Sequence, residues 1–477
     1  MKKKIYPLKV GLFGIGLDTY WVQFAGLKEK LENNIRIVEN RIRELGEEVV
    51  NLGLIDNAQK AMEAGHTFRT ADVDIIFLYV TTYALSSTVL PVVQRAKVPV
   101  IILNLAPEAA IDYATFNALE NRTQMTGEWL SWCSACPVPE IANVFKRAGI
   151  TFHEITGMLH NDPESQQETR EWVEAAKVAK IMSHNRLGAM GNYYSGMLDI
   201  YTDLTLQLST FGGHIEMIEV DELSVFRKGI TDKEINERCN YMKEVFDVQP
   251  DCDVTELEKA ARTSVALDQL IERYDLGSLA YYYKGAPGSE NEESIASIIL
   301  GNSVLTARGI PVAGEYEIKN AQAMKIMDSF GAGGSFTEYY AMDFNDDVVL
   351  MGHDGPGHIK IAEGKPKVRP LSQYHGKVGS GLSVEMAVKY GLITCLSVVE
   401  NNGKLVLLVA EGESVEGPIL EIGNTNSRYR FSIGARKFVN QWNSHGPAHH
   451  CAVGIGHIAS KIKKLGNILG IESVVVC

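Results

Sequence analysis

The amino-acid sequence predicts an α/β fold, with two doubly wound parallel-sheet domains followed by a mainly antiparallel β domain. Up to about residue 330, strands rich in Val and Ile alternate with helical segments, as in parallel sheets covered on both faces. After that point short β-like runs follow one another, and turn signals such as Asn401-Asn402-Gly403 separate them. The length of 477 residues also favours about three domains over one.

The first domain is expected over residues 1–182. Its strand-like runs lie at 8–14, 48–52, 73–80 and 98–103, and a helical pattern spans 26–45. The turn Gly14-Ile15-Gly16 lacks the third glycine of a dinucleotide fingerprint, so we expect a tight turn and no nicotinamide cofactor. Ligands of parallel sheets meet the carboxyl ends of strands, which makes Tyr20 a substrate-binding candidate. An aromatic cover over the core explains Tyr20 equally well.

The second and third domains are expected over 183–330 and 331–477. A new unit opens at 185–191, and helical patterns follow at 230–245 and 256–274, with strand-like runs at 215–220 and 278–283. The third domain carries β-like runs at 348–351, 358–361, 394–399, 404–409, 418–422 and 429–432.

Charge and hydropathy limit the partners that we expect. The formal net charge of −13 argues against nucleic acid and anionic membranes. No apolar run reaches the roughly 18 residues that span a bilayer. The basic start at residues 1–4 leads into a β-like run and not into a signal-peptide core. We therefore expect a cytoplasmic protein with no membrane partner.

The cysteines form a sparse, odd-numbered set of seven, which does not resemble a disulfide framework. Cys133 and Cys136 have CxxC spacing, which raises a redox or zinc interpretation. There is no second CxxC, and Trp129 to Trp132 do not form the usual redox setting. Structural or pocket-lining thiols therefore rank ahead of redox or zinc chemistry.

The stretch from Gly314 to His358 carries the candidate chemistry. Glu315 precedes a helical pattern at 318–330, a glycine-rich turn ends that helix, and Glu338 follows in the returning segment. His353 comes directly after the short run 348–351. Taken singly, these residues are explained as a helix-start acid, a surface carboxylate and a loop histidine, and Glu317 is better placed for the first role. Jointly, two carboxylates and an imidazole at element ends favour a divalent-metal site.

A fourth ligand is expected in the segment Asn443 to His450, where paired histidines follow a Gly-Pro turn. With this segment, the sequence resembles the L-arabinose isomerases, within the L-arabinose/L-fucose isomerase superfamily. The motifs read Gly314-Glu315-Tyr316, Ser335-Phe336-Thr337-Glu338, Met351-Gly352-His353 and Ala448-His449-His450. The family has Gly-Glu-Gly at the first motif, so Tyr316 departs from it. The resemblance covers most of the chain, but only these four motifs are specific.

The resemblance implies that Glu315, Glu338, His353 and His450 hold one divalent cation. Hard oxygen ligands mixed with imidazole suit Mn²⁺, with Co²⁺ or Mg²⁺ as alternatives. An aldose–ketose isomerase uses such a cation to polarise sugar oxygens, while a carboxylate moves a proton through a cis-enediol. Glu315 and Glu338 are then the acid/base pair, and either could act first as the base.

Several further residues are candidates for contact with the substrate. His449 is assigned to a sugar hydroxyl, and His358 to substrate contact or to a turn. Met190, Tyr283 and Cys136 are further substrate-binding candidates. The family has Gln and His where this chain has Cys133 and Cys136, and that segment serves a neighbouring subunit's site. A homo-oligomer, either a hexamer or a tetramer, is therefore expected.

The expected function is a metal-dependent aldose–ketose sugar isomerase, with L-arabinose to L-ribulose as the first substrate pair by resemblance alone. A sugar epimerase or lyase with the same metal site is one alternative, because it would use the same enediol chemistry. A non-catalytic sugar-binding protein is another, because such proteins also have two doubly wound domains. The additional β domain with His449 and His450 disfavours the binding protein.

Overall fold

The computed structural model describes residues 6–371 and 379–477, so the basic start of the chain lies outside it. The chain divides into two compact units, one ending at Lys180 and the other covering Ile181–Cys477. The division falls within the last turn of α8 (Pro163–Ser183). Among the described residues, no helix combines the length and the apolar character needed to cross a bilayer.

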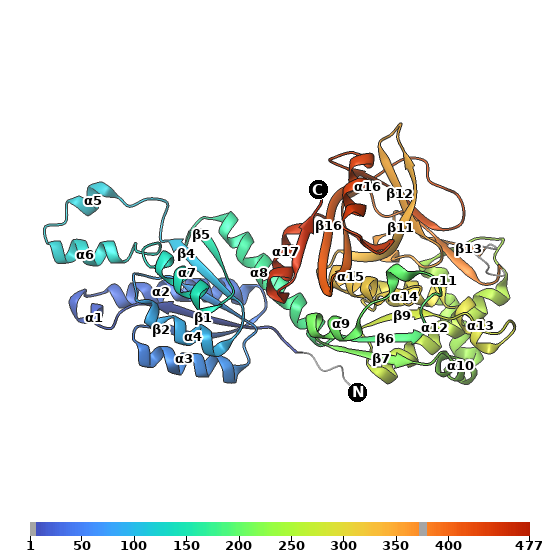
Figure 1. The fold of residues 1–477 in the computed structure, drawn as a ribbon, viewed down its shortest axis with the longest axis horizontal. Helices are drawn as coiled ribbons and strands as arrows, with labels where there is room; N and C mark the ends of the chain where they lie inside the picture. Colours follow the sequence, from blue (N-terminus) through green and yellow to red (C-terminus); the bar gives the residue numbers. More distant parts are fainter. Residues whose placement is uncertain (1–5, 372–378) are drawn as a thin grey trace. The chain divides into compact units, whose positions relative to one another are not determined.

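The N-terminal unit is built on a five-stranded parallel sheet with the order β2-β1-β3-β4-β5 (Figure 1). Its strands are β1 (Lys9–Ile15), β2 (Glu48–Ile55), β3 (Ile75–Tyr79), β4 (Val100–Ala106) and β5 (Phe152–Met158). Its other helices are α1 (Tyr20–Gln23), α2 (Leu27–Glu44), α3 (Ala58–Ala71), α4 (Leu90–Ala96), α5 (Tyr113–Asn117), α6 (Arg122–Leu130) and α7 (Val138–Ala148). β3 is buried along its whole length, because helices cover both faces of the sheet.

The second unit begins with a four-stranded parallel sheet, whose order β10-β9-β6-β7 repeats the winding of the first. Its strands are β6 (Arg186–Gly191), β7 (His214–Ile218), β9 (Ser278–Tyr282) and β10 (Val312–Ala313). Its helices are α9 (Leu204–Phe211), α10 (Val220–Gly229), α11 (Asp232–Val245), α12 (Val254–Tyr274), α13 (Glu290–Ala296) and α14 (Ile299–Ala307). A short 3₁₀ helix, η2 (Leu198–Ile200), follows β6.

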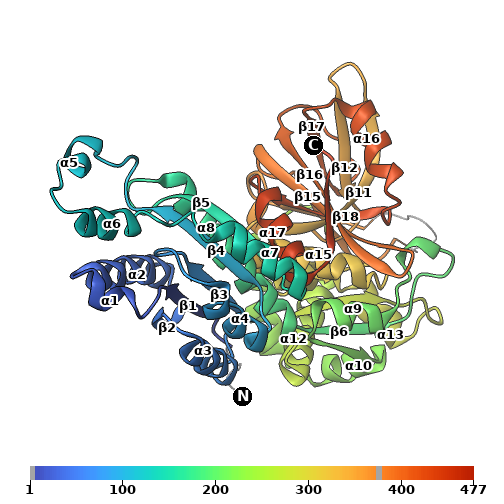
Figure 2. The ribbon, with the colours of Figure 1, turned by 60° about the vertical axis from the view of Figure 1, so that its left-hand side comes forward.

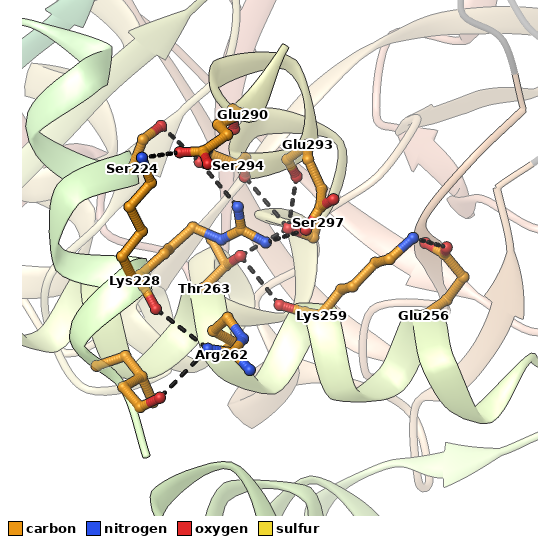
Figure 3. Close-up of polar contacts among 12 residues, drawn as sticks. Ser224, Lys228, Glu256, Lys259, Arg262, Thr263, Glu290, Glu293, Ser294 and Ser297 are labelled. Carbon is orange, nitrogen blue, oxygen red and sulfur yellow. Dashed lines mark hydrogen bonds and ion pairs between the residues drawn. The ribbon is translucent and has the colours of Figure 1, made fainter. Parts of the chain in front are cut away.

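A buried polar cluster fixes α13 on its neighbours α10 and α12. Arg227, which is only 5 % exposed, donates to Ser294 Oγ at 3.1 Å and to Glu293 Oε1 at 2.7 Å. Thr263 of α12 shares a 2.6 Å hydrogen bond with Ser297 (Figure 3). Because a buried guanidinium needs such partners, the cluster holds the segment that follows β9 in a defined place.

A mainly antiparallel sheet follows in the second unit, in the order β15-β18-β11-β12-β17-β16-β19. Its strands are β11 (Gly333–Asp343), β12 (Val348–His353), β15 (Gly391–Asn401), β16 (Lys404–Val415), β17 (Thr425–Phe431), β18 (His450–Ile455) and β19 (Glu472–Val475). β15 also pairs with β16, which closes six of these strands into a barrel, and only β19 joins in parallel. The helices α16 (Ala435–Ser444) and α17 (Ala459–Leu469) lie on its outside (Figure 2).

The predicted fold class is therefore confirmed, but two predicted β-like runs are wrong. Residues 358–361 form a 3₁₀ helix, η3 (Ile359–Ile361), and residues 418–422 adopt no regular element. Both runs are short apolar segments, for which hydrophobicity alone does not specify the backbone conformation. A small sheet of β8 (Asp247–Val248), β13 (Lys367–Pro370) and β14 (Leu382–Glu385) was not predicted.

Helix α15 (Ile318–Ser329) lies between the two larger sheets of the second unit. It contacts β9 and β10 on one side and β11, β15 and β18 on the other, and Figure 2 shows it between them. Every residue from Ile318 to Met327 is buried, as expected of a helix enclosed on all sides. Its start and the strand that follows it carry the residues of the candidate site.

Candidate metal centre

Strand register brings three of the predicted site positions together. Glu338 of β11 lies opposite His450 of β18 on one side and opposite Gly352 of β12 on the other. Residues directly opposite in an antiparallel sheet have their Cβ atoms about 5 Å apart. His353 ends β12, immediately after Gly352. A side chain at Gly352 would meet the Thr425 carbonyl at 1.8 Å, so this position must lack one.

Glu315 reaches the same place from a loop. It follows β10, and both Glu315 and Tyr316 have left-handed backbone conformations, with φ of 58° and 64°. Such conformations are unfavourable for residues other than glycine and persist where the surroundings fix them. The Tyr316 N–H donates to the Tyr281 carbonyl at 2.9 Å, and the Glu317 N–H donates to the Gly314 carbonyl at 2.9 Å. These bonds hold the Glu315 carboxylate in its position.

Three imidazoles face the Glu315 carboxylate through the same ring nitrogen. The Nε2 atoms of His450, His449 and His353 lie 3.4, 3.7 and 4.0 Å from its oxygens. His449 Nε2 also lies 3.9 Å from Glu338 Oε2, which connects the second carboxylate to the group. Two carboxylates and three imidazoles therefore converge on one small region.

The other ring nitrogen of each imidazole has a partner of its own. His450 Nδ1 lies 2.5 Å from Glu317 Oε2, and His449 Nδ1 lies 2.6 Å from Asp199 Oδ2 of η2. His353 Nδ1 lies 2.8 Å from the Asp354 carbonyl. With each Nδ1 paired to an oxygen, the Nε2 atom of each imidazole is left facing Glu315.

Burial governs the electrostatics of these groups. It raises the pKa of Glu315 to about 7 and that of Glu317 to about 8, against 4.5 for an ordinary glutamate. It lowers the pKa of His353 to about 4 and that of His450 well below 6.5. For His449, burial acts against the charged form, but the hydrogen bond and charge of Asp199 leave its pKa raised. His353 and His450 are thus neutral near pH 7, the form in which imidazole binds metals.

Phe336 forms an apolar wall beside these groups. Its ring centroid lies 4.5 Å from that of His353 and 4.3 Å from that of His450, and it is only 2 % exposed. It packs on both imidazoles, so it restricts their rotation and keeps water from that side of the site.

The donor set fits a divalent cation. One ligand atom each from Glu315, His449 and His450 lies within 4.8 Å of the others. Glu315 Oε2 and His450 Nε2 are buried, and neither has a hydrogen-bond partner among the described residues. Buried polar atoms without partners are rare and costly, and a shared cation would satisfy both. Mixed carboxylate and imidazole ligands suit Mn²⁺ and its neighbours in the first transition series.

The remaining sequence-predicted residues are His358, Met190, Tyr283, Tyr20 and Cys136. His358 is buried beside η3, and neither of its ring nitrogens has a hydrogen-bond partner among the described residues. Met190 is fully buried in the hydrophobic core of the second unit, and Tyr283 packs against that core. Tyr20 and Cys136 belong to the N-terminal unit, where the two influence each other electrostatically.

Sequence reasoning missed Asp199 and the role of Glu317. Asp199 is 250 residues from His449, and it also accepts the His449 backbone N–H at 2.9 Å. Glu317 stands at the N-cap of α15, but its side chain makes no capping bond and is only 1 % exposed. Its carboxyl group pairs with His450 Nδ1, so Glu317 is not a solvated acid at the start of the helix. The only sequence signal for the role of Glu317 was its position as an acid two residues after Glu315.

Comparison with known proteins agrees with this geometry in the C-terminal part. Residues 333–472 match the family model of the L-arabinose isomerase C-terminal domain. No curated protein sequence matches the chain. The matched range contains Glu338, His353, His449 and His450, and a domain of this kind indicates a sugar isomerase of the aldose–ketose class. The match to residues 333–472 supports membership of the chain in the arabinose isomerase family.

Proposed function

We propose that the protein is a metal-dependent aldose–ketose isomerase, with Mn²⁺ as the first metal to test and Co²⁺ or Mg²⁺ as alternatives. The observation that carries the proposal is the convergence of three imidazole Nε2 atoms on the Glu315 carboxylate, each with its Nδ1 held by an oxygen. The first substrate pair to test is L-arabinose and L-ribulose, and this choice rests on the family alone.

The residues that would hold the cation are Glu315, Glu338, His353 and His450, and His449 lies close enough to take part. When bound, a divalent cation polarises the carbonyl and hydroxyl oxygens of an open-chain sugar as a Lewis acid. Glu317 and the Asp354 carbonyl keep His450 and His353 turned toward the site. Glu315 and Glu338 supply negative charge on the same side.

Proton transfer is assigned to the two carboxylates. One takes the proton from the carbon beside the carbonyl while the carbonyl oxygen gains a proton, which gives the cis-enediol. The other then returns a proton to the former carbonyl carbon while the second hydroxyl loses its proton and becomes the new carbonyl. Since the reaction is reversible, the roles exchange with its direction. Burial places the pKa of Glu315 at about 7 in the metal-free protein, and a bound cation would favour the ionised form that accepts a proton. Asp199 holds His449 within reach of both carboxylates, where it can bind a sugar hydroxyl.

Metal depletion and restoration test this proposal. The chelated protein is assayed with a panel of pentoses, hexoses and C6-modified sugars, before and after Mn²⁺, Co²⁺ or Mg²⁺ is added back. We expect no turnover without metal and ketose formation with it. Full activity of the metal-free protein contradicts the mechanism. Chromatography of the products separates isomerisation from epimerisation and from carbon–carbon cleavage, and binding of a sugar without turnover would indicate a binding protein.

We also propose a homo-oligomer, a hexamer or a tetramer, with a small-molecule sugar as the ligand. This proposal rests on the family, in which the segment near Cys133 completes a neighbouring subunit's site. Light scattering coupled to size-exclusion chromatography measures the mass of the active species. A fully active monomer would be inconsistent with it.

A further inference from the structure

Two cysteines of the N-terminal unit lie in contact, and the proton transfer proposed above involves neither thiol. Cys133 and Cys136 belong to the turn between α6 and α7, and their Sγ atoms are 2.9 Å apart. A disulfide bond is about 2.05 Å long, so the two sulfurs lie within about 1 Å of bonding distance. A small rotation of the side chains would bring them together.

The two thiols differ in exposure. Cys136 is exposed, whereas Cys133 is only 1 % exposed. A small reagent in solution therefore reaches Cys136 first and cannot reach Cys133. Burial, together with the hydrogen bond from Cys136, raises the pKa of the Cys133 thiol. This asymmetry gives Cys136 the role of the attacking thiol and Cys133 that of the resolving thiol.

The turn is fixed on both sides, so the thiols stay close together. Thr82 donates to the Leu130 carbonyl at 2.8 Å, just before the turn. After it, Glu140 in the first turn of α7 accepts from the Ser86 N–H at 2.8 Å. Both anchors lie in the loop that follows β3, at the carboxyl end of the parallel strands. The CxxC pair therefore borders the edge of the sheet at which ligands bind in this kind of fold.

We propose that Cys133 and Cys136 form a reversible dithiol–disulfide site that reacts with low-molecular-weight disulfides. The Cys136 thiolate attacks one sulfur of the small disulfide, forms a mixed disulfide and releases one small thiol. Cys133 then attacks the Cys136 sulfur, which forms the intramolecular bond and releases the second small thiol. The cysteine pair loses two electrons and two protons, and the small disulfide gains them.

The same chain contains a matched control. Cys395 of β15 and Cys451 of the adjacent strand β18 influence each other electrostatically, and both are buried, at 0 % and 3 % exposed. This second pair has neighbouring thiols but no exposed member. If contact between thiols were sufficient, both pairs would oxidise. If an exposed attacking thiol is needed, only the CxxC pair would.

The test treats the native full-length protein with oxidised glutathione, followed by acid quenching, alkylation of the remaining thiols and mass spectrometry of the intact protein and its peptides. We expect a product that has lost two hydrogens, with the new bond between Cys133 and Cys136, and with Cys395 and Cys451 alkylated. Addition of excess reduced glutathione should restore both thiols.

Single variants separate the two steps. Cys133→Ser should retain one glutathione on Cys136, because no resolving thiol remains. Cys136→Ser should form neither bond nor adduct at Cys133. Circular dichroism monitors folding, and Cys133→Ala replaces Cys133→Ser if the hydroxyl is not tolerated. The proposal is overturned if wild-type protein keeps a stable adduct on Cys136, if neither thiol reacts, or if Cys395 and Cys451 oxidise first.

Discussion

The candidate metal centre is assembled from two regions that position their side chains in different ways. In the antiparallel sheet, Glu338 and His450 lie opposite each other with ordinary strand backbone, so the register of the whole sheet determines their separation. In the loop before α15, Glu315 and Tyr316 adopt left-handed conformations that neighbouring hydrogen bonds hold. The sheet therefore fixes its site residues without local strain, whereas the loop fixes Glu315 at a local free-energy cost.

The largest expected effect is a loss of activity, and it distinguishes the proton-transfer role of Glu338 from the ligand role of His450 within the sheet. Glu338→Gln keeps the size of the side chain but cannot accept a proton, so activity should fall by at least about 10²-fold. His450→Ala mainly removes a nitrogen ligand, so raising free Mn²⁺ should restore part of its activity. Rates titrated against free Mn²⁺ measure both variants. Recovery of Glu338→Gln at high Mn²⁺ would show that Glu338 acts only as a ligand.

The shifted pKa values of His358 and Glu317 should make the stability of the protein depend on pH in opposite directions. Burial lowers the pKa of His358, after β12, to about 4, so the folded state binds fewer protons than the unfolded state. Its contribution to stability is complete above pH 6.5 and is lost as the pH falls, by about 3 kcal/mol in total. The raised pKa of Glu317, about 8, means that its contribution is complete below pH 4.5 and is lost as the pH rises through 8.

Chemical denaturation of metal-free protein across this pH range measures the free energy of unfolding. His358→Asn should flatten the decrease below pH 6.5, and Glu317→Gln should flatten the decrease between pH 6.5 and 8. In the upper window His358 is neutral in both the folded and the unfolded state, so the two effects separate. Identical pH profiles for wild type and either variant would contradict the corresponding assignment.

A smaller effect is expected from the residues that orient the ligands. Glu317→Ala leaves His450 Nδ1 without its acceptor, and loss of such a partner typically weakens metal affinity by about 10- to 100-fold. Isothermal titration calorimetry with Mn²⁺ measures the affinity directly. Glu413→Ala, which removes an exposed carboxylate of β16, is the matched control and should bind as wild type does. Equal affinities for both variants would remove Glu317 from the ligand-orienting role.

The smallest effect tests the strain itself, with the same substitution in both regions. Glu315→Gly relieves a left-handed backbone, so the metal-free protein should become more stable by about 1 kcal/mol, although activity is lost. Glu338→Gly removes a side chain from a strand interior and should lower stability by about 0.5–1 kcal/mol. Urea denaturation gives both values. A decrease in both variants would mean that the loop carries no relievable strain.

The contrast between the regions also explains what the sequence could predict. The alternation of strands and helices predicted the two parallel sheets and the antiparallel domain, because burial imposes those patterns locally. The family motifs named Glu315, Glu338, His353 and His450, whose positions follow from element ends. The partners Asp199 and Glu317 could not be found in this way, since they lie 250 and 133 residues from the histidines they contact.

His449 shows a limit of pattern reasoning at the level of one residue. Neighbouring residues within a strand face opposite sides, which favours different roles for His449 and His450. However, β18 begins at His450, so the alternation does not extend to His449. Both imidazoles consequently direct Nε2 toward Glu315. A boundary shift of one residue decides this geometry, and sequence patterns do not define boundaries that finely.

The enclosure of α15 determines how the molecule can be dissected. The helix lies just before the matched family range, yet it covers β11, β15 and β18 within that range. A fragment of residues 333–472 would leave those apolar strand faces open to solvent, which is a recognised cause of aggregation. A fragment beginning at Ile310 would retain the helix and should be the more soluble of the two. The range matched by the family model and the smallest fragment that we expect to fold therefore begin at different residues.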